Sequence, residues 1–151
     1  VIMKLLEDRL PITSITVMVQ KEAAERLCAQ PGTRECGAVS AAVQYYAEPK
    51  ILFEVSRGSF MPAPNVDSAV IQLRIRKEPP VDVHDEALFF RVIRAAFAQR
   101  RKTAVNSISN TLHMSKQQVT DAFEQAGVRA NSRAEALTLP EFAAVVNQLA
   151  D

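Results

Sequence analysis

Apolar and polar positions change their pattern along the chain, and the change divides it into two unlike parts. In the first part, helical and strand-like patterns alternate. Residues 1–9 favour a helix that ends before Pro11. Residues 13–20 are β-branched and mostly apolar, which predicts a buried strand. Helical patterns follow at 21–30 and 38–47, and in the second of these Val39, Ala42, Val43 and Tyr46 would share one face.

Two further segments of the first part alternate as strands do. Residues 51–57 and 66–76 each place apolar side chains at every second position. In the second segment the inward positions would be Ala69, Ile71, Leu73 and Ile75. Successive alternating strands predict an antiparallel pair with one wet face. Their connection, 58–65, is too long for a tight hairpin, and long loops between regular strands often carry function.

Everything after a charged, proline-containing linker at 77–86 has helical spacing. Residues 87–102 read as one strong helix, and a final helix is expected at 140–150 with Pro140 in its first turn. Three pairs match the capping-box spacing: Ser115 with Gln118, Ser132 with Glu135, and Thr138 with Glu141. The predicted fold is therefore α/β plus all-α, with domains at 1–78 and 79–151.

The formal net charge is only +1, so no basic field covers the whole molecule, and any such signal must be local. One is present: Arg91, Arg94, Arg100, Arg101 and Lys102 occur within twelve residues that contain no acid. On a continuous helix, four of them fall within an arc of about 100°. A solvated helix end and a phosphate-binding surface both remain open. For the second, Thr103, Asn106 and Ser107 would add neutral donors.

Other composition features narrow the class of protein. Two cysteines, Cys28 and Cys36, are too few for a disulfide scaffold and indicate free thiols in a reducing, cytoplasmic location. His84 and His113 lack partners at ligand spacing, so no metal site is expected. No run of 18 apolar residues occurs, so no membrane span is expected either.

The loop sequence "FMPAPNVDSAV", residues 60–70, places one aromatic beside two prolines. Pro62 and Pro64 have fixed φ and no backbone donor, and they bias the residues before them towards extended geometry. A stiff loop can hold Phe60 as a stacking platform for a base. The same ring could instead seal the end of the core, and the residues alone favour that second role.

Several motifs, in this order, resemble the rRNA adenine N6-dimethyltransferases, and specifically the branch acting on the bacterial small subunit. They are "MVQKEAAERL", "VQYYAE", "GSFMPAPNVDSAVIQL", "AAFAQRRKT" and "NSRAEALTLPEFA". The resemblance covers essentially the whole chain. The erythromycin-resistance methylases are similar over the first half, whereas the "QRRKT" segment and the C-terminal motif favour the small-subunit branch.

The resemblance implies a fold, a reaction and a set of site residues. The fold is the later half of a Rossmann-like S-adenosylmethionine-dependent methyltransferase domain, followed by a small helical domain that binds rRNA. The reaction dimethylates N6 of two adjacent adenosines near the 3′ end of small-subunit rRNA, late in assembly of the immature small ribosomal subunit. Phe60 would stack on the flipped adenine, with Pro62, Pro64 and Asn65 in the substrate loop. Gln99, Arg100, Arg101 and Lys102 would contact rRNA, together with Arg91 and Arg94.

The family's Gly-rich cofactor loop and its "N-L-P-Y" motif do not occur in this sequence. Val1 already stands inside a helical pattern, so we expect the sequence to be the later part of a longer enzyme. These residues alone are then expected neither to methylate nor to bind S-adenosylmethionine strongly. An alternative is a non-catalytic rRNA-binding assembly factor of the small subunit. The sequence upstream of Val1 would separate the two.

Overall fold

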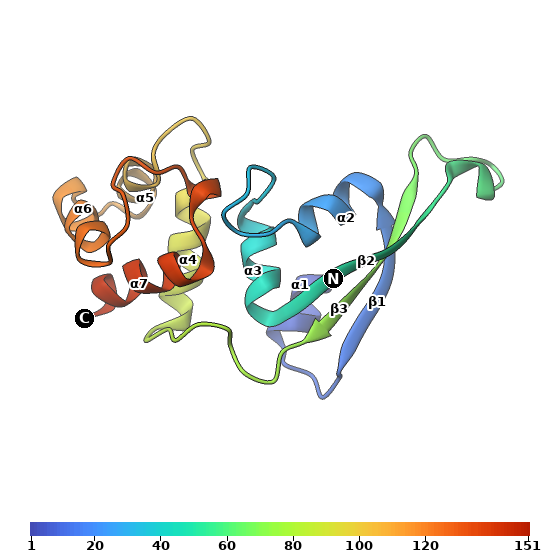
Figure 1. The fold of residues 1–151 in the computed structure, drawn as a ribbon, viewed down its shortest axis with the longest axis horizontal. Coiled ribbons are helices and arrows are strands. Elements are labelled where there is room, and N and C mark those ends of the chain that lie inside the picture. The colour runs from blue at the N-terminus through green and yellow to red at the C-terminus, as the bar shows by residue number, and fades with distance from the viewer.

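The computed structural model describes all residues, 1–151, and arranges them as a small sheet region beside a helical region (Figure 1). The helices α1, α2 and α3 and the three strands come from the first half of the chain, and α4 to α7 from the second. The bounds are α1 Ile2–Glu7, β1 Ser14–Gln20, α2 Lys21–Cys28, α3 Ala38–Tyr46, β2 Ala47–Val55, η1 Arg57–Ser59, β3 Ser68–Ile75, α4 Glu86–Phe97, α5 Ala104–Leu112, α6 Lys116–Gln125, η2 Ala134–Ala136 and α7 Leu139–Ala150.

The sheet has the order β1-β3-β2, and both outer strands run antiparallel to β3. The antiparallel pairing predicted for the two alternating strands is therefore confirmed, as are the buried positions Ala69, Ile71 and Leu73. The strand predicted at 13–20 is confirmed as β1, but its predicted burial is wrong. Only Ile15 of β1 is buried, because β1 is an edge strand with one face open to solvent.

Helices cover one face of the sheet and leave the other open. Leu6, Ala24 and Val43, one from each of α1, α2 and α3, pack with Ile15, Ala47, Ala69, Ile71 and Leu73 in a cluster of eight buried residues. On the opposite face, Met18 pairs with Val70 and Val70 with Phe53, so these three side chains form one row across the sheet. Met18 is 51% exposed and Phe53 57% exposed.

A larger cluster of 22 buried residues fills the helical region and includes Phe89, Phe123 and Phe142. Helix α3 belongs to both regions, since its Ala41 and Tyr45 lie in this cluster while its Val43 lies under the sheet. The predicted single apolar face of α3 is wrong for the same reason, because Val39 is exposed whereas Ser40, Ala41, Gln44 and Tyr45 are buried. The division of the chain into domains at residue 78 stays a prediction.

A polar junction joins the two regions beside α3. The guanidinium of Arg9 donates to both carboxylate oxygens of Glu86 at 2.9 Å, and the Tyr45 hydroxyl donates to the same carboxylate at 2.7 Å. Arg9 also lies 5.5 Å from the centre of the Tyr46 ring. The start of α4 is thereby tied to the segment after α1 and to the end of α3.

The caps of the later helices follow the sequence in two of three places. The Ser115 hydroxyl accepts from the backbone N–H of Gln118, and Thr138 with Glu141 forms a complete capping box at α7. The Ser132 prediction is wrong, because the short η2 begins after Arg133 and has no side-chain cap. None of the helices combines the length and apolarity needed to cross a bilayer.

Candidate functional site

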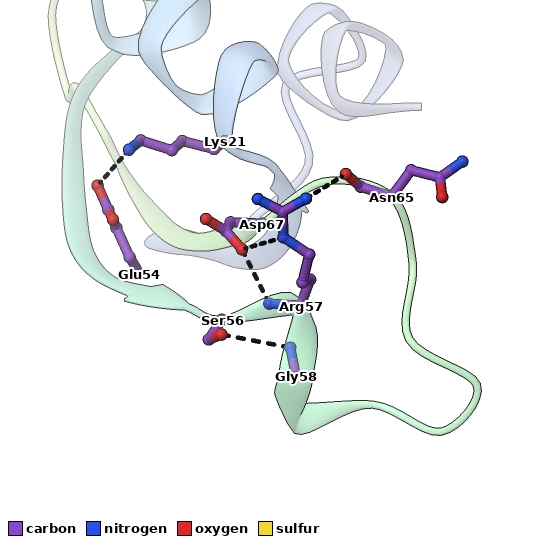
Figure 2. A network of polar contacts seen from close by, with 7 residues as sticks. All are labelled: Lys21, Glu54, Ser56, Arg57, Gly58, Asn65 and Asp67. Carbon is purple, nitrogen blue, oxygen red and sulfur yellow. Dashed lines mark hydrogen bonds and ion pairs between the residues drawn. The ribbon is translucent and has the colours of Figure 1, made fainter.

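The loop between β2 and β3 is closed at its base by a polar network centred on Arg57 (Figure 2). The Asp67 carboxylate accepts from the Arg57 backbone N–H at 2.9 Å and lies 3.4 Å from its guanidinium. The same guanidinium donates to the Asn65 carbonyl at 2.9 Å. On the other side, the Lys21 backbone N–H donates to the Asp67 carbonyl at 2.9 Å, which anchors the loop to the start of α2.

Phe60 follows the η1 turn inside this loop, and its backbone N–H donates to the Arg57 carbonyl at 3.3 Å. Its side chain is half-buried and is not among the residues packed against either hydrophobic cluster. A core-sealing role for Phe60 is therefore not supported. Beyond it the loop is open to solvent, since Met61 is 99% exposed and Pro62, Pro64 and Asn65 are exposed as well.

A small cavity of about 190 Å³ lies at the root of the loop, between Gln20, Lys21 and Glu22 on one side and Arg57, Asn65, Val66 and Asp67 on the other. The backbone N–H of Arg57 lowers the pKa of Asp67, and the Arg57 and Lys21 charges act in the same direction. Asn65 contributes its carbonyl to the network, while its side-chain amide points away from it (Figure 2).

The helix that carries the basic residues ends earlier than the sequence predicted. α4 ends at Phe97, and residues 99–102 form a turn in which the Lys102 backbone N–H donates to the Gln99 carbonyl. Ser107 stabilises this end because its hydroxyl donates to the Ala95 carbonyl and accepts from the Gln99 backbone N–H. The prediction that one continuous helix places the basic residues from Arg91 to Lys102 along a single arc is therefore wrong. All five basic side chains are nevertheless exposed.

Two of the three neutral donors predicted beyond the basic segment, Ser107 and Thr103, are used by the fold. Ser107 is fully buried and cannot reach a phosphate. The Thr103 hydroxyl caps α5 by accepting from the Asn106 backbone N–H at 3.3 Å. Their role is to begin α5 and to fix the preceding turn.

A cavity of about 570 Å³ brings part of the basic turn together with residues far away in the sequence. Arg100 and Lys102 line it from the α4–α5 turn, Arg26 from α2, and Arg34 from the loop before α3. Glu35 and Glu135 also line it, so four cations face two carboxylates. Such a surface favours a polyanion. Arg91, Arg94 and Arg101 do not line this cavity.

Arg26 and Arg34 are the cavity residues that reading the sequence missed. Neither belongs to a run of basic residues, and only the tertiary fold places them beside Arg100 and Lys102. The cavity also contains Cys36, whose burial raises its thiol pKa to about 11. Both cysteines are free thiols.

The two candidate features are not adjacent. The cavity lies where the helices α2, α3 and α4 meet, whereas the loop carrying Phe60 projects from the far end of the sheet (Figure 1). Neither cavity fits S-adenosylmethionine. Its sulfonium is a cation, and in the cavity of about 570 Å³ four basic side chains outnumber two carboxylates. The cavity at the loop root, about 190 Å³, is smaller than the roughly 300 Å³ at which ordinary ligand pockets begin. We assign the cofactor no residue of this chain.

Comparison with known proteins places the chain in a sequence family. The family described as "Ribosomal RNA adenine dimethylase" matches residues 1–151. The chain is 51% identical over 152 residues to "Ribosomal RNA small subunit methyltransferase A" of Geobacillus sp. (strain WCH70), covering 99% of this chain and 52% of the relative. The protein of the same name from Oceanobacillus iheyensis is 48% identical, covering 97% and 51%. The chain thus spans about half the length of these curated relatives.

Two solved structures are similar in fold. The crystal structure of the 23S rRNA methyltransferase ErmE aligns with a TM-score of 0.69 at 20% identity, covering 99% of this chain and 60% of that one. A dimethyladenosine transferase from Plasmodium falciparum aligns with a TM-score of 0.72 at 20% identity, covering 95% and 59%. The mixed α/β class predicted from the sequence is confirmed at this level.

Proposed function

Because the chain belongs to the ribosomal RNA adenine dimethylase family, we propose that it is the base-stacking and RNA-docking part of an rRNA adenine N6-dimethyltransferase. Its substrate would be two adjacent adenosines near the 3′ end of small-subunit rRNA, on the immature small subunit in the cytoplasm. The architecture proposed for residues 1–78 is the later half of a Rossmann-like domain, with 79–151 as the rRNA-binding helical domain. The cofactor S-adenosylmethionine would be bound by the portion of the relatives that this chain does not cover.

The observation that carries the proposal is the setting of Phe60. A half-buried ring outside both clusters has no core to stabilise, and its loop is closed by a fixed polar network. An aromatic face held this way suits a flipped base, because stacking needs a flat surface in a constant place. Methyl transfer to an exocyclic amine depends mostly on alignment, so a positioned ring contributes to the rate.

The docking part of the proposal rests on the basic cavity. Arg26, Arg34, Arg100 and Lys102 converge there from three segments, and phosphate contacts of this kind supply most of the affinity for RNA. Arg91, Arg94 and Arg101 would extend the surface beyond the cavity, and Gln99 lines it as a neutral contact.

The experiment measures methyl transfer to small subunits by the longer protein that spans the length of the relatives. Phe60→Ala is expected to lower turnover by about 10-fold or more, since the absence of stacking costs about 1–3 kcal/mol. Met61→Ala is the matched control, because this neighbour is almost fully exposed. Full turnover in the Phe60→Ala protein would refute the base-stacking role.

A further inference from the structure

We propose that Arg57 is a positioning residue, which holds Phe60 in place by clamping the two ends of its loop. This inference rests on the proposed function, since the ring has to be positioned for a base. Figure 2 shows the clamp: one side chain reaches across the loop to the carboxylate of Asp67 and to the backbone carbonyl of Asn65.

The clamp acts on Phe60 through a short path. Arg57 begins the η1 turn, and the Phe60 backbone N–H donates to the Arg57 carbonyl. The backbone of Arg57 is itself fixed by its N–H bond to Asp67. A displacement of Arg57 therefore moves the residue three positions later, and with it the ring.

Few apolar contacts are available to hold the Phe60 loop in place. Met61, Pro62, Ala63, Pro64, Asn65 and Val66 are all exposed, and Phe60 packs against neither hydrophobic cluster. The prolines stiffen the tip but do not attach it to the sheet. Without the clamp, the loop would have to be ordered when substrate binds, which reduces the productive fraction.

Arginine suits this position better than lysine. Its planar guanidinium presents several donors in a fixed fork, so it can bind the Asp67 carboxylate and the Asn65 carbonyl together. Lysine presents all its donors from one freely rotating nitrogen atom, so it does not hold the two acceptors in the same fixed geometry. Lys21, nearby, pairs instead with Glu54 at 3.5 Å and does not reach across the loop.

The first test is hydrogen exchange of the 151-residue chain, which needs no methylation. Arg57→Ala is expected to speed exchange of the Phe60 amide at least about 10-fold, because opening of the loop becomes easier, and to leave the amide of Ile71 in β3 unchanged. Arg57→Lys should behave like Arg57→Ala. Unchanged exchange at Phe60 would overturn the clamp.

The second test is a mutant cycle in the longer protein. Arg57→Ala is expected to lower kcat about 10-fold with KM for the RNA within about 2-fold, because a misplaced ring costs rate. In a Phe60→Ala background it should cost nothing further. Arg129→Ala, an exposed arginine of the helical region, is the control.

The outcomes separate the two proposals. Additive losses, or a raised KM with unchanged kcat, would make Arg57 a direct RNA contact and overturn its positioning role. Full turnover of Phe60→Ala alone would refute the base-stacking function. In that case the exchange experiment still decides whether Arg57 clamps the loop.

Discussion

The sheet region and the helical region bury their apolar side chains in different ways. The helical region encloses 22 buried residues, whereas the sheet region encloses eight, all on one side of the sheet. The row formed by Met18, Val70 and Phe53 lies on the open side. The helical region is closed around its own core, and the sheet region is one layer short of a sheet covered on both faces.

The largest difference between the two regions is expected when one phenylalanine in each is replaced by alanine. Phe89 is fully buried among the helices, so Phe89→Ala should reduce the free energy of unfolding by about 3–5 kcal/mol. Phe53 lies in the open row, so Phe53→Ala should change it by about 0.5 kcal/mol or less. Urea unfolding followed by circular dichroism measures both. Equal losses would mean that the open row is covered in solution.

The second prediction concerns the charges that the helical region contributes to the cavity. Each phosphate that the protein neutralises adds about 0.7–0.9 to the slope of log affinity against log salt, so Arg100→Glu with Lys102→Glu should flatten the slope by about 1.5. Lys116→Glu with Arg129→Glu makes the same change in net charge at exposed positions outside the cavity. Titration of an RNA hairpin with two adjacent adenosines measures the slopes. Identical slopes for both pairs would exclude the cavity as a docking site.

The smallest effect is expected at the junction between the regions. Burial opposes ionisation of Glu86, but hydrogen bonds from Tyr45 and Arg9 outweigh it, and the net pKa is lowered. Because its side chain is 40% exposed, Glu86→Gln should reduce the free energy of unfolding by only about 1 kcal/mol at pH 7.

The sign of the pH dependence follows from the lowered pKa. The stability that ionised Glu86 contributes is fully present above the ordinary pKa that its carboxyl has in the unfolded chain, and it is lost as the pH falls through the lower folded pKa. The difference between the unmodified and Glu86→Gln chains should therefore close in strong acid. Glu124→Gln, exposed on α6, is the control. A difference independent of pH would contradict the assignment of the junction to this carboxylate.

The local sequence pattern predicted an element correctly where the surrounding structure buries the same side chains that the pattern makes apolar. The alternation in β3 matches its burial because this central strand has one covered and one open face. The β-branched run in β1 suggested burial, but the burial of a strand depends on what covers it. The helix α4 stops before its good helix formers at 99–102 because Ser107, ten residues after Phe97, satisfies the groups at its end.

The candidate site was predictable only where its residues stand together in the sequence. Phe60 and the prolines form one motif, and so do Arg100 and Lys102. Arg57 carries no signal of its own, since its importance comes from Asp67, ten positions away across the loop. Arg26 and Arg34 join Arg100 only after the chain has folded back on itself.

Helix α2 connects the two halves of the proposed site. Its first residue, Lys21, bonds the end of the Phe60 loop, and Arg26 near its other end lines the basic cavity. Lys21 and Arg26 are five positions apart, which is about 7.5 Å along an α-helix, and the helix keeps this spacing fixed. On the proposed function, α2 fixes the distance between the Phe60 loop and the basic cavity. If the proposed function holds, an RNA would be methylated only when the spacing between its docked phosphate and its target base matches this fixed distance.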